Sequence, residues 1–280
     1  MTMSKITFFL ILISGLFLFS TCDIVDAPYI ETPDGNDTSQ FVKKVLVEDY
    51  TGHTCPNCPS AAVTAAQLKN LYGDQLVVMA VHAGFFANPN PNDSLFALDL
   101  RTHAGNTWND FFKIELYPNG IVNRIPDDAG IYFLPPGNWG SMVVAEMQKK
   151  AEARITVHND FSTSTRQLTT NVFTEFITAQ ADPCNLIVCV TQDSIIGGQK
   201  YPTEVIEDYV FMDVLRGSLN GDWGEDVSDG QSIVVGEKYE KTYSHVFPPE
   251  WIAKNCHVVA FVYNTQTKSI VQVEEKDVLE

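Results

Sequence analysis

A pair of cysteines separated by two residues lies between an expected strand and an expected helix, in TGHTCPNCP at residues 51–59. Residues 42–50, VKKVLVEDY, have aliphatic and β-branched side chains at their centre and predict a strand. Residues 60–71, SAAVTAAQLKNL, are rich in alanine and predict a helix. Residues 75–83, QLVVMAVHA, are almost wholly apolar and predict a second strand, covered on both faces. This order favours two parallel strands joined by a right-handed crossover, with the cysteines at the start of the crossover helix.

The place of the cysteines favours thiol–disulfide chemistry. At a helix N-terminus, unpaired backbone N–H groups and the helix dipole stabilise a thiolate, so we expect Cys55 to be an exposed nucleophile. Cys58 lies one helical turn further on and can act as the resolving thiol that attacks a mixed disulfide on Cys55. A structural zinc site would need two further ligands at suitable spacing, and the sequence has no second Cys-x-x-Cys. We therefore expect no metal and no cofactor.

The pattern of the chain changes at about residue 154. Before it, turn residues and apolar periodicity predict helices over residues 94–100, 106–114 and 138–151, and a hairpin from residues 121–125 and 131–133. After it, seven short runs alternate apolar and polar residues between turn residues, which predicts an antiparallel β-sandwich. We therefore expect an α/β domain over residues 41–154 and an all-β domain over residues 155–280.

The N-terminus predicts export and lipid attachment. Lys5 precedes a short apolar run over residues 6–19, and small residues then lead to Cys22. This pattern resembles a bacterial lipoprotein signal, which implies a signal peptide over residues 1–21 and lipid on Cys22. The alternative is ordinary secretion with an incidental cysteine. Residues 22–40 are acidic and rich in turn formers, and they predict a flexible tether.

The charge of the chain limits its partners. Aspartate and glutamate outnumber lysine and arginine by 35 to 18, which gives a formal net charge of −17. Binding of phosphate backbones needs a basic surface, so we expect no nucleic-acid partner. Four of the acids gather in NGDWGEDVSDG at residues 220–230. We interpret this segment as a solvated hairpin loop, with a calcium site as the alternative.

The order strand, Cys-x-x-Cys, helix, strand, inserted helical segment, proline, hairpin and helix resembles the thioredoxin fold. The resemblance implies a cis proline facing the cysteines, at Pro118 after Tyr117. It also implies a buried acid six residues before the first cysteine, where Asp49 stands with Glu48 beside it. Such an acid can take up the proton of Cys58 during exchange. The alternative is that the two acids are solvated at an edge of the sheet.

Five segments together resemble a family of Bacteroidota outer-membrane lipoproteins that is named for an outer-membrane protein of twenty-eight kilodaltons. They are LVEDYTGHTCPNCP, VVMAVHAG, RTHAG, YPNGIVNR and NCHVVAFVYN. The resemblance implies an α/β thioredoxin-like domain followed by an all-β Ig-like sandwich. It also implies an anchor in outer-membrane lipid through Cys22, with the domains facing the periplasm or the cell surface.

Two histidines and three further cysteines complete the set of candidate residues. An imidazolium at His53 would lower the pKa of the nearby thiol, whereas the alternative is a solvent-facing turn residue. His82 ends the second strand, so it belongs either to the site or to a satisfied structural position. Cys184 and Cys189 flank a strand, five residues apart, and face opposite sides, so they cannot easily bond each other. We expect instead a link between Cys189 and Cys256.

Two functions are compatible with these residues. In the first, the chain performs thiol–disulfide exchange on an envelope or secreted protein partner, through Cys55 and Cys58. In the second, it is not an enzyme: the two cysteines form a structural disulfide, and the β-sandwich binds a host, glycan or envelope component.

Overall fold

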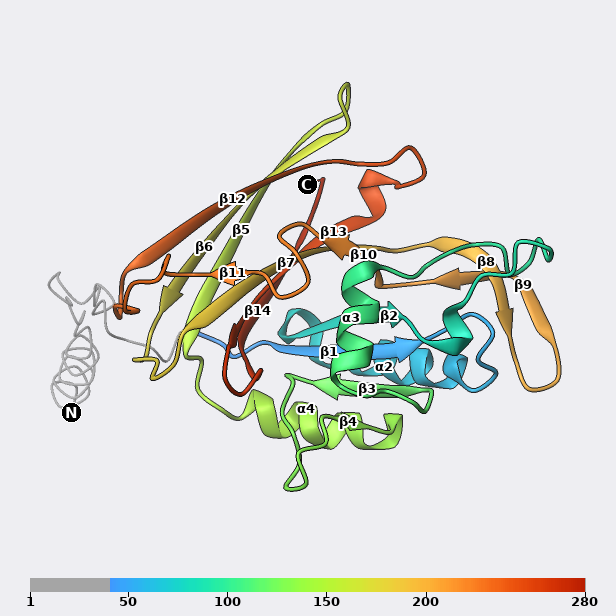
Figure 1. Cartoon of the computed structure of the whole chain (residues 1–280), viewed down its shortest axis with the longest axis horizontal. Helices are drawn as coiled ribbons and strands as arrows, with labels where there is room; N and C mark the ends of the chain where they lie inside the picture. The colour runs from blue at the N-terminus through green and yellow to red at the C-terminus, as the bar shows by residue number, and fades with distance from the viewer. Residues whose placement is uncertain (1–40, 280) are drawn as a thin grey trace, which may run out of the picture. The chain divides into compact units, whose positions relative to one another are not determined.

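A nine-stranded mixed sheet runs through both halves of the chain (Figure 1). The structure is a computed structural model that describes residues 41–279; the expected signal peptide, Cys22 and most of the tether lie outside the described residues. In spatial order the strands are β14 (Ile270–Asp277), β13 (Cys256–Asn264), β7 (Cys184–Gln192), β10 (Val214–Ser218), β2 (Leu76–His82), β1 (Val45–Thr51), β3 (Asn119–Val122) and β4 (Phe133–Leu134). The short strand β11 (Glu225–Asp226) pairs with β7 outside this path.

The α/β region follows the element order expected from the sequence. Strands β1 and β2 are parallel, and α2 (Cys58–Tyr72) connects them. Strands β3 and β4 form the expected hairpin, and α4 (Trp139–Met147) follows it. The second predicted helix is present as α3 (His103–Phe111). Short 3₁₀ turns complete the region as η2 (Gly73–Gln75), η3 (Phe85–Ala87) and η4 (Pro136–Asn138), and η5 (Ala253–Asn255) precedes β13.

The alternation of side chains along β1 and β2 builds a core on each face of the sheet. Val45 and Val47 pack with residues of α2 and α4 in one core. Leu46 and Tyr50 pack on the other face, in the core that contains Trp108 of α3. Consecutive residues of β1 therefore point to opposite faces, which decides what each acidic residue of this strand can contact.

The helix predicted over residues 94–100 is wrong, because this segment forms turns. Asp93 does not cap a helix; its carboxylate accepts a hydrogen bond from the backbone N–H of Leu95 two residues later. The carbonyl of Leu95 accepts a hydrogen bond from Gly198, and Leu100 packs with Phe211. Contacts with a distant segment therefore override the local helical pattern.

The second half of the chain is β-rich and has two facing sheets. Strands β5 (Ala153–Ser162), β6 (Gln167–Phe176) and β12 (Lys238–Val246) form a three-stranded antiparallel sheet. Its buried face packs against β7, β13 and β14 around one apolar core. A separate hairpin, β8 (Ile195–Lys200) and β9 (Val205–Phe211), pairs only with itself within residues 41–279. The large sheet crosses the expected boundary near residue 154, because β10 lies between β7 and β2.

The predicted Cys189–Cys256 disulfide is wrong, because both cysteines are free and buried. In the register of β7 with β13, Cys189 lies opposite Val259, and Cys256 lies opposite Gln192. Cys189 belongs to the core on the α3 side of the large sheet, whereas Cys256 belongs to the core between the two sheets. The sheet therefore separates the two thiols. Cys184 lies in the same core as Cys256, so it faces away from Cys189 as expected.

Candidate functional site

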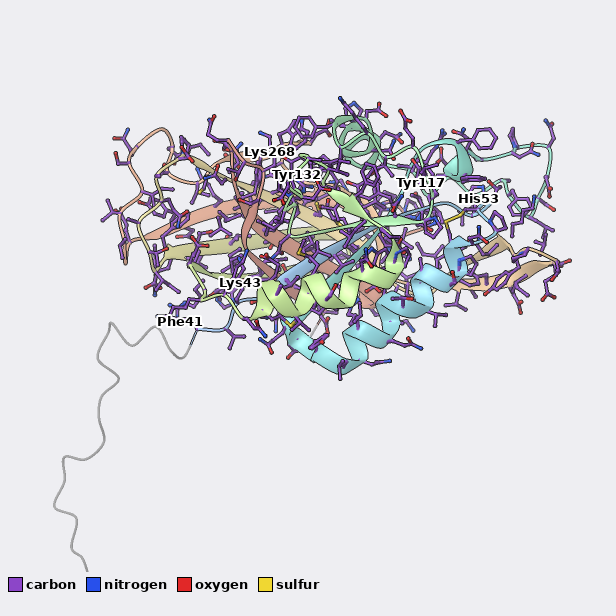
Figure 2. The ribbon with its side chains drawn as sticks, turned by 90° about the horizontal axis from the view of Figure 1, so that it is seen from below. Phe41, Lys43, His53, Tyr117, Tyr132 and Lys268 are labelled. Carbon is purple, nitrogen blue, oxygen red and sulfur yellow. A yellow bond between two sulfur atoms is a disulfide. The ribbon has the colours of Figure 1, made fainter. Side chains whose placement is uncertain are left out.

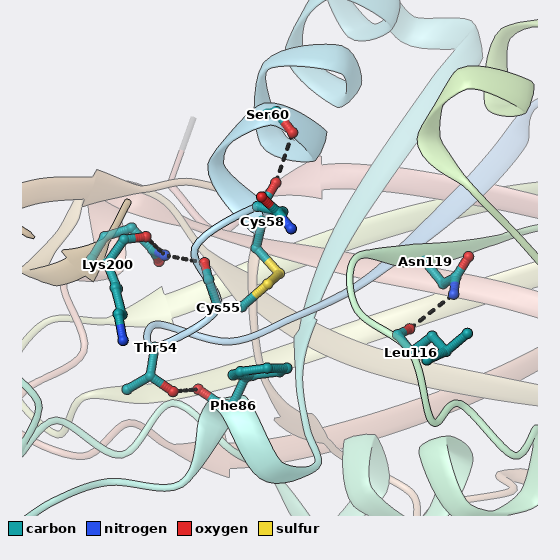
Figure 3. Close-up of a disulfide and its surroundings, with 10 residues drawn as sticks. Thr54, Cys55, Cys58, Ser60, Phe86, Leu116, Asn119 and Lys200 are labelled. Atoms are coloured by element: carbon teal, nitrogen blue, oxygen red, sulfur yellow. Dashed lines mark hydrogen bonds between the residues drawn. A yellow bond between two sulfur atoms is a disulfide. The ribbon is translucent and has the colours of Figure 1, made fainter. Parts of the chain in front are cut away.

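Cys55 and Cys58 form a disulfide at the start of the crossover helix (Figure 3). Cys58 is the first residue of α2, and the Cα atoms of the two cysteines are 5.4 Å apart. The predicted position at a helix N-terminus is therefore confirmed. The predicted exposure of Cys55 is wrong, because Cys55 is 1% exposed and Cys58 is 2% exposed.

Two segments from other parts of the chain hold the backbone before the disulfide. The β8–β9 hairpin contributes Gln199, whose side-chain amide donates to the carbonyl of Cys55 at 3.0 Å. The turn at η3 contributes the carbonyl of Phe86, which accepts from both the N–H and the hydroxyl of Thr54, at 3.1 and 2.8 Å. Gly52 permits this approach, since a Cβ atom there would lie 2.4 Å from the backbone of Phe86. The burial of the cysteines follows from this close packing.

Glu48 and Asp49 are both buried, so the alternative of two solvated acids is contradicted. They point to opposite faces of β1. The carboxylate of Glu48 accepts two hydrogen bonds from the guanidinium of Arg124, at 2.8 and 2.7 Å, and both side chains are fully buried. The rings of Trp108, Phe112, Phe261, Tyr263 and Trp223 surround this guanidinium at 4.8 to 5.9 Å. Glu48 is therefore part of the core on the face away from α2.

Asp49 lies on the face that α2 covers. It lines a cavity of about 190 Å³ together with Ala62 and Ala65 of α2 and Tyr209 of β9. One oxygen of its carboxyl group has no hydrogen-bond partner among the described residues. Burial raises the pKa of Asp49 to about 7, and the nearby charge of Asp213 adds to this effect. A carboxyl group that titrates near neutral pH can both donate and accept a proton there.

His53 and His82 are buried beside aromatic rings rather than exposed to solvent. His53 stacks on Phe96 with ring centroids 5.6 Å apart, and His82 meets the ring of Phe211 edge-on at 5.4 Å. Burial lowers the pKa of His53, and it lowers the pKa of His82 to about 3. Both rings are therefore neutral at neutral pH. His53 is neither a solvent-facing turn residue nor a cation that would activate a thiol.

The Tyr117–Pro118 peptide bond is cis, as expected. Pro118 directly precedes β3, and Figure 3 shows its neighbours Leu116 and Asn119 beside the disulfide. The hydroxyl of Tyr117 donates to Asn109 of α3 at 2.5 Å. The ring of Tyr117 also meets that of Phe86 at 6.0 Å, and Figure 2 shows Tyr117 and His53 at one end of the described chain. The structure therefore gathers this loop, His53 and the disulfide at the same end of the sheet.

The acidic loop between β10 and β12 uses its carboxylates within the protein. Asp222 accepts from Thr107 at 2.7 Å, Glu225 accepts from Tyr243 at 2.6 Å, and Asp226 accepts from the backbone of Ser228. Within residues 41–279, no three His, Cys, Asp or Glu side chains lie close enough to hold a metal ion.

The sequence analysis did not predict that the β8–β9 hairpin contacts the backbone of Cys55. Gln199 and Tyr209 stand in β-patterned runs and carry no catalytic motif. The one local signal is the pair Gly197–Gly198, because glycines inside a strand often mark a close approach of another backbone. A Cβ atom on Gly198 would lie 2.4 Å from the carbonyl oxygen of Leu95.

Comparison with known proteins gives a family match and similar structures. A family model described as outer membrane protein Omp28 matches residues 105–280. HBP35 of Porphyromonas gingivalis is 15% identical, with a TM-score of 0.67 over 85% of this chain and 76% of that chain. A domain of the outer membrane lipoprotein Omp28 from Porphyromonas gingivalis is 22% identical, with a TM-score of 0.32 over 46% of this chain and 88% of its own. No curated protein matches the sequence.

The likeness to HBP35 concerns the fold alone, since so few residues are identical. It supports a mixed α/β region joined to a β-rich region. Within residues 41–279, no helix is long and apolar enough to cross a membrane. The family model covers well over half of the chain and confirms the resemblance seen in the sequence. The chain belongs to the Omp28 family of outer membrane proteins, and this places it at the outer membrane.

Proposed function

We propose that the chain is a lipid-anchored envelope protein that exchanges its Cys55–Cys58 disulfide with thiols of a protein partner. The observation that carries this proposal is the position of Asp49. Asp49 lines a cavity beside Ala62 and Ala65 of α2, the helix that Cys58 begins, and its pKa is raised to about 7. A purely structural disulfide has no need of a buried acid poised between its two protonation states.

The exchange is a pair of thiolate displacements. A thiolate of the partner attacks Sγ of Cys55, and a mixed disulfide forms as the bond to Cys58 breaks. Cys58 leaves as a thiolate and takes the proton of Asp49. A second thiolate of the partner then attacks the partner's own sulfur in the mixed disulfide and releases Cys55 as a thiolate, which the N-terminus of α2 stabilises. The partner gains a disulfide, and the chain becomes a dithiol; the reverse sequence reduces a partner.

The two regions of the chain have separate roles in this proposal. Residues 41–154 carry the redox chemistry, and Pro118 with Tyr117 shapes the place where the partner's backbone lies. Residues 155–280 form an Ig-like sandwich that presents or recognises the partner; the packing of two β-sheets around one core supports this assignment. Lipid on Cys22 holds both regions at the membrane.

A second candidate function is favoured by the burial of the cysteines. At 1% and 2% exposure, the disulfide has the environment of a structural bond that stabilises the chain. The β-rich region would then bind an envelope, host or glycan component, and the cysteines would have no redox partner.

A redox titration separates the two functions. We would equilibrate the purified full chain in glutathione buffers and measure the fraction of Cys55–Cys58 disulfide. A potential between about −120 and −270 mV is expected for an exchange protein, and a potential below about −300 mV would establish a structural bond. The Cys58→Ser variant should then trap partners on Cys55, and the Cys55→Ser variant is its matched control.

A further inference from the structure

The β8–β9 hairpin is the part of the β-rich region that reaches the disulfide. It extends beyond the large sheet at the end where β1 and β2 finish (Figure 1). No other strand within residues 41–279 pairs with it. Its attachment therefore depends on side-chain packing, on its two connections to the sheet and on a few hydrogen bonds.

Those hydrogen bonds join the hairpin to the backbone around the disulfide. The side-chain amide of Gln199 donates to the carbonyl of Cys55 at 3.0 Å and to that of Lys200 at 2.9 Å, and Gln199 is 3% exposed. The N–H of Lys200 donates to the carbonyl of His53 at 2.8 Å. The N–H of Gly198 donates to the carbonyl of Leu95 at 3.1 Å. Three consecutive residues of β8 thus donate three hydrogen bonds to the rest of the chain. Each such bond contributes only about 1 kcal/mol net, so the three can break together when the hairpin moves.

The base of the hairpin has the features of a hinge. Ser194, before β8, has a φ of 59°, and Asp213, after β9, has a φ of 55°. Non-glycine residues in this left-handed region are uncommon, and a change of φ at a few such positions is how hinges absorb a rotation. The N–H of Asp213 donates to the carboxylate of Asp193 at 2.7 Å, so the two ends of the hairpin stay together.

The packing of the hairpin is uneven. Phe211 and Tyr209 pack inward with Leu100, and Tyr209 also lines the cavity of Asp49. Ile196 and Val210 form a cross-strand pair that is 66% and 47% exposed. Displacement of the hairpin would therefore uncover the disulfide and the cavity of Asp49 in one movement.

We propose that residues 195–211 are a lid over the Cys55–Cys58 disulfide, which rotates about Ser194 and Asp213 before any thiolate reaches Cys55. In the closed state the disulfide is inaccessible, so the lid sets the rate of exchange and keeps small thiols from the site. The lid would regulate access to the Cys55–Cys58 disulfide. For a protein partner it rests on the proposed exchange function, but the gating itself applies to any reductant.

The test measures the rate at which dithiothreitol reduces the disulfide in the full oxidised chain. Cysteines that become reactive are alkylated, and Cys55 and Cys58 are counted by peptide mass spectrometry, separately from the free cysteines. Gln199→Ala removes the side-chain hydrogen bond that joins the lid to the carbonyl of Cys55, and reduction should become about fivefold faster. Glu207→Ala, at an exposed position of the same hairpin, is the matched control and should leave the rate unchanged.

A second variant replaces residues 195–211 by two glycines, which the closeness of Asp193 and Asp213 permits. It should be reduced more than tenfold faster than the natural chain. A rate that stays unchanged in Gln199→Ala, with native circular dichroism, would overturn the lid. The lid would also be overturned if the disulfide of the natural chain were reduced only at the rate of global unfolding. Because these are rates with a small reductant, they are independent of the potential and the trapping on which the exchange function depends.

Discussion

At the scale of single residues, neighbouring acids in β1 have opposite roles because a strand alternates its faces. Glu48 is neutralised by Arg124 in a fully buried, aromatic part of the core. Asp49 makes no ion pair within residues 41–279, and its acidic neighbour Asp213 is itself bound by Lys69 at 2.6 Å. The resemblance to the thioredoxin fold implied a buried acid at Asp49, whereas no local pattern could reveal the partner of Glu48.

The raised pKa of Asp49 predicts how stability depends on pH. Because the folded-state pKa is about 7 and the ordinary value is 3.8, the native chain binds the proton more tightly than the unfolded chain. The contribution of Asp49 to the free energy of unfolding is therefore fully present below about pH 4, and it is lost as the pH rises through about 7. Asp49→Asn removes the ionisation, and it should raise the free energy of unfolding by about 4 kcal/mol more at pH 8 than at pH 4.

Urea unfolding of both proteins at pH 4 and pH 8 measures this difference. Asp74→Asn, at an exposed acid, is the control and should change stability equally at the two pH values. Equal effects of Asp49→Asn at both pH values would contradict the buried, neutral carboxyl group.

The buried Glu48–Arg124 pair predicts a large loss when one partner is removed. Glu48→Gln leaves the Arg124 guanidinium without its counter-ion in a fully buried position. We expect a loss of about 3 to 5 kcal/mol in the free energy of unfolding, because an uncompensated buried charge is costly. Unfolding in guanidinium chloride at pH 7 measures this loss. The control is Glu175→Gln, which breaks the half-exposed pair with Arg154 and should cost about 1 kcal/mol or less. Similar losses in the two variants would show that the aromatic rings alone hold Arg124.

At the scale of elements, local patterns predicted β1, α2, β2 and the β3–β4 hairpin because each forms its own periodic face. The same reasoning failed at residues 94–100, where Leu95 and Leu100 contact the β8–β9 hairpin and its cluster about one hundred residues away. The contact of Gln199 could not be predicted for the same reason, since its partner Cys55 is 144 positions earlier in the sequence. Contacts that depend on tertiary structure are invisible to periodicity.

The self-paired hairpin predicts a local difference in amide hydrogen exchange. Strand β7 lies between β13 and β10, so its backbone amides are protected on both sides. The β8–β9 hairpin has only its own ladder and the bonds to the disulfide region. Peptides from residues 195–211 should therefore exchange faster than those from residues 184–192, measured by mass spectrometry on the oxidised chain. Equal protection in the two segments would mean that the hairpin opens only when the whole chain unfolds.

At the scale of the whole molecule, the shared sheet decides how the chain unfolds. Strand β10, which follows the hairpin, supplies the neighbour of β2, and Leu215 packs with Met79 and Val81 in one core. Phe261 of β13 packs in the same core and lies 5.0 Å from the guanidinium of Arg124. The core of the α/β region is therefore completed by residues far beyond its expected boundary.

This arrangement predicts one unfolding transition for both regions. Residues 41–154 alone would expose the α3-side core of β2 and should not fold, whereas the longer chain should unfold cooperatively. Trp108, Trp139 and Trp223 report on the cores of the α/β region, and Trp251 reports on the core between the two sheets of the β-rich region. Phenylalanine replacements that leave one region fluorescent at a time should therefore give coincident urea midpoints. Two separate midpoints, or a folded 41–154 fragment with dispersed amide resonances, would show that the shared sheet is a contact between independent domains. With one transition, the redox site and the β-rich region are stabilised together, and a partner that binds the second region acts directly on the stability of the first.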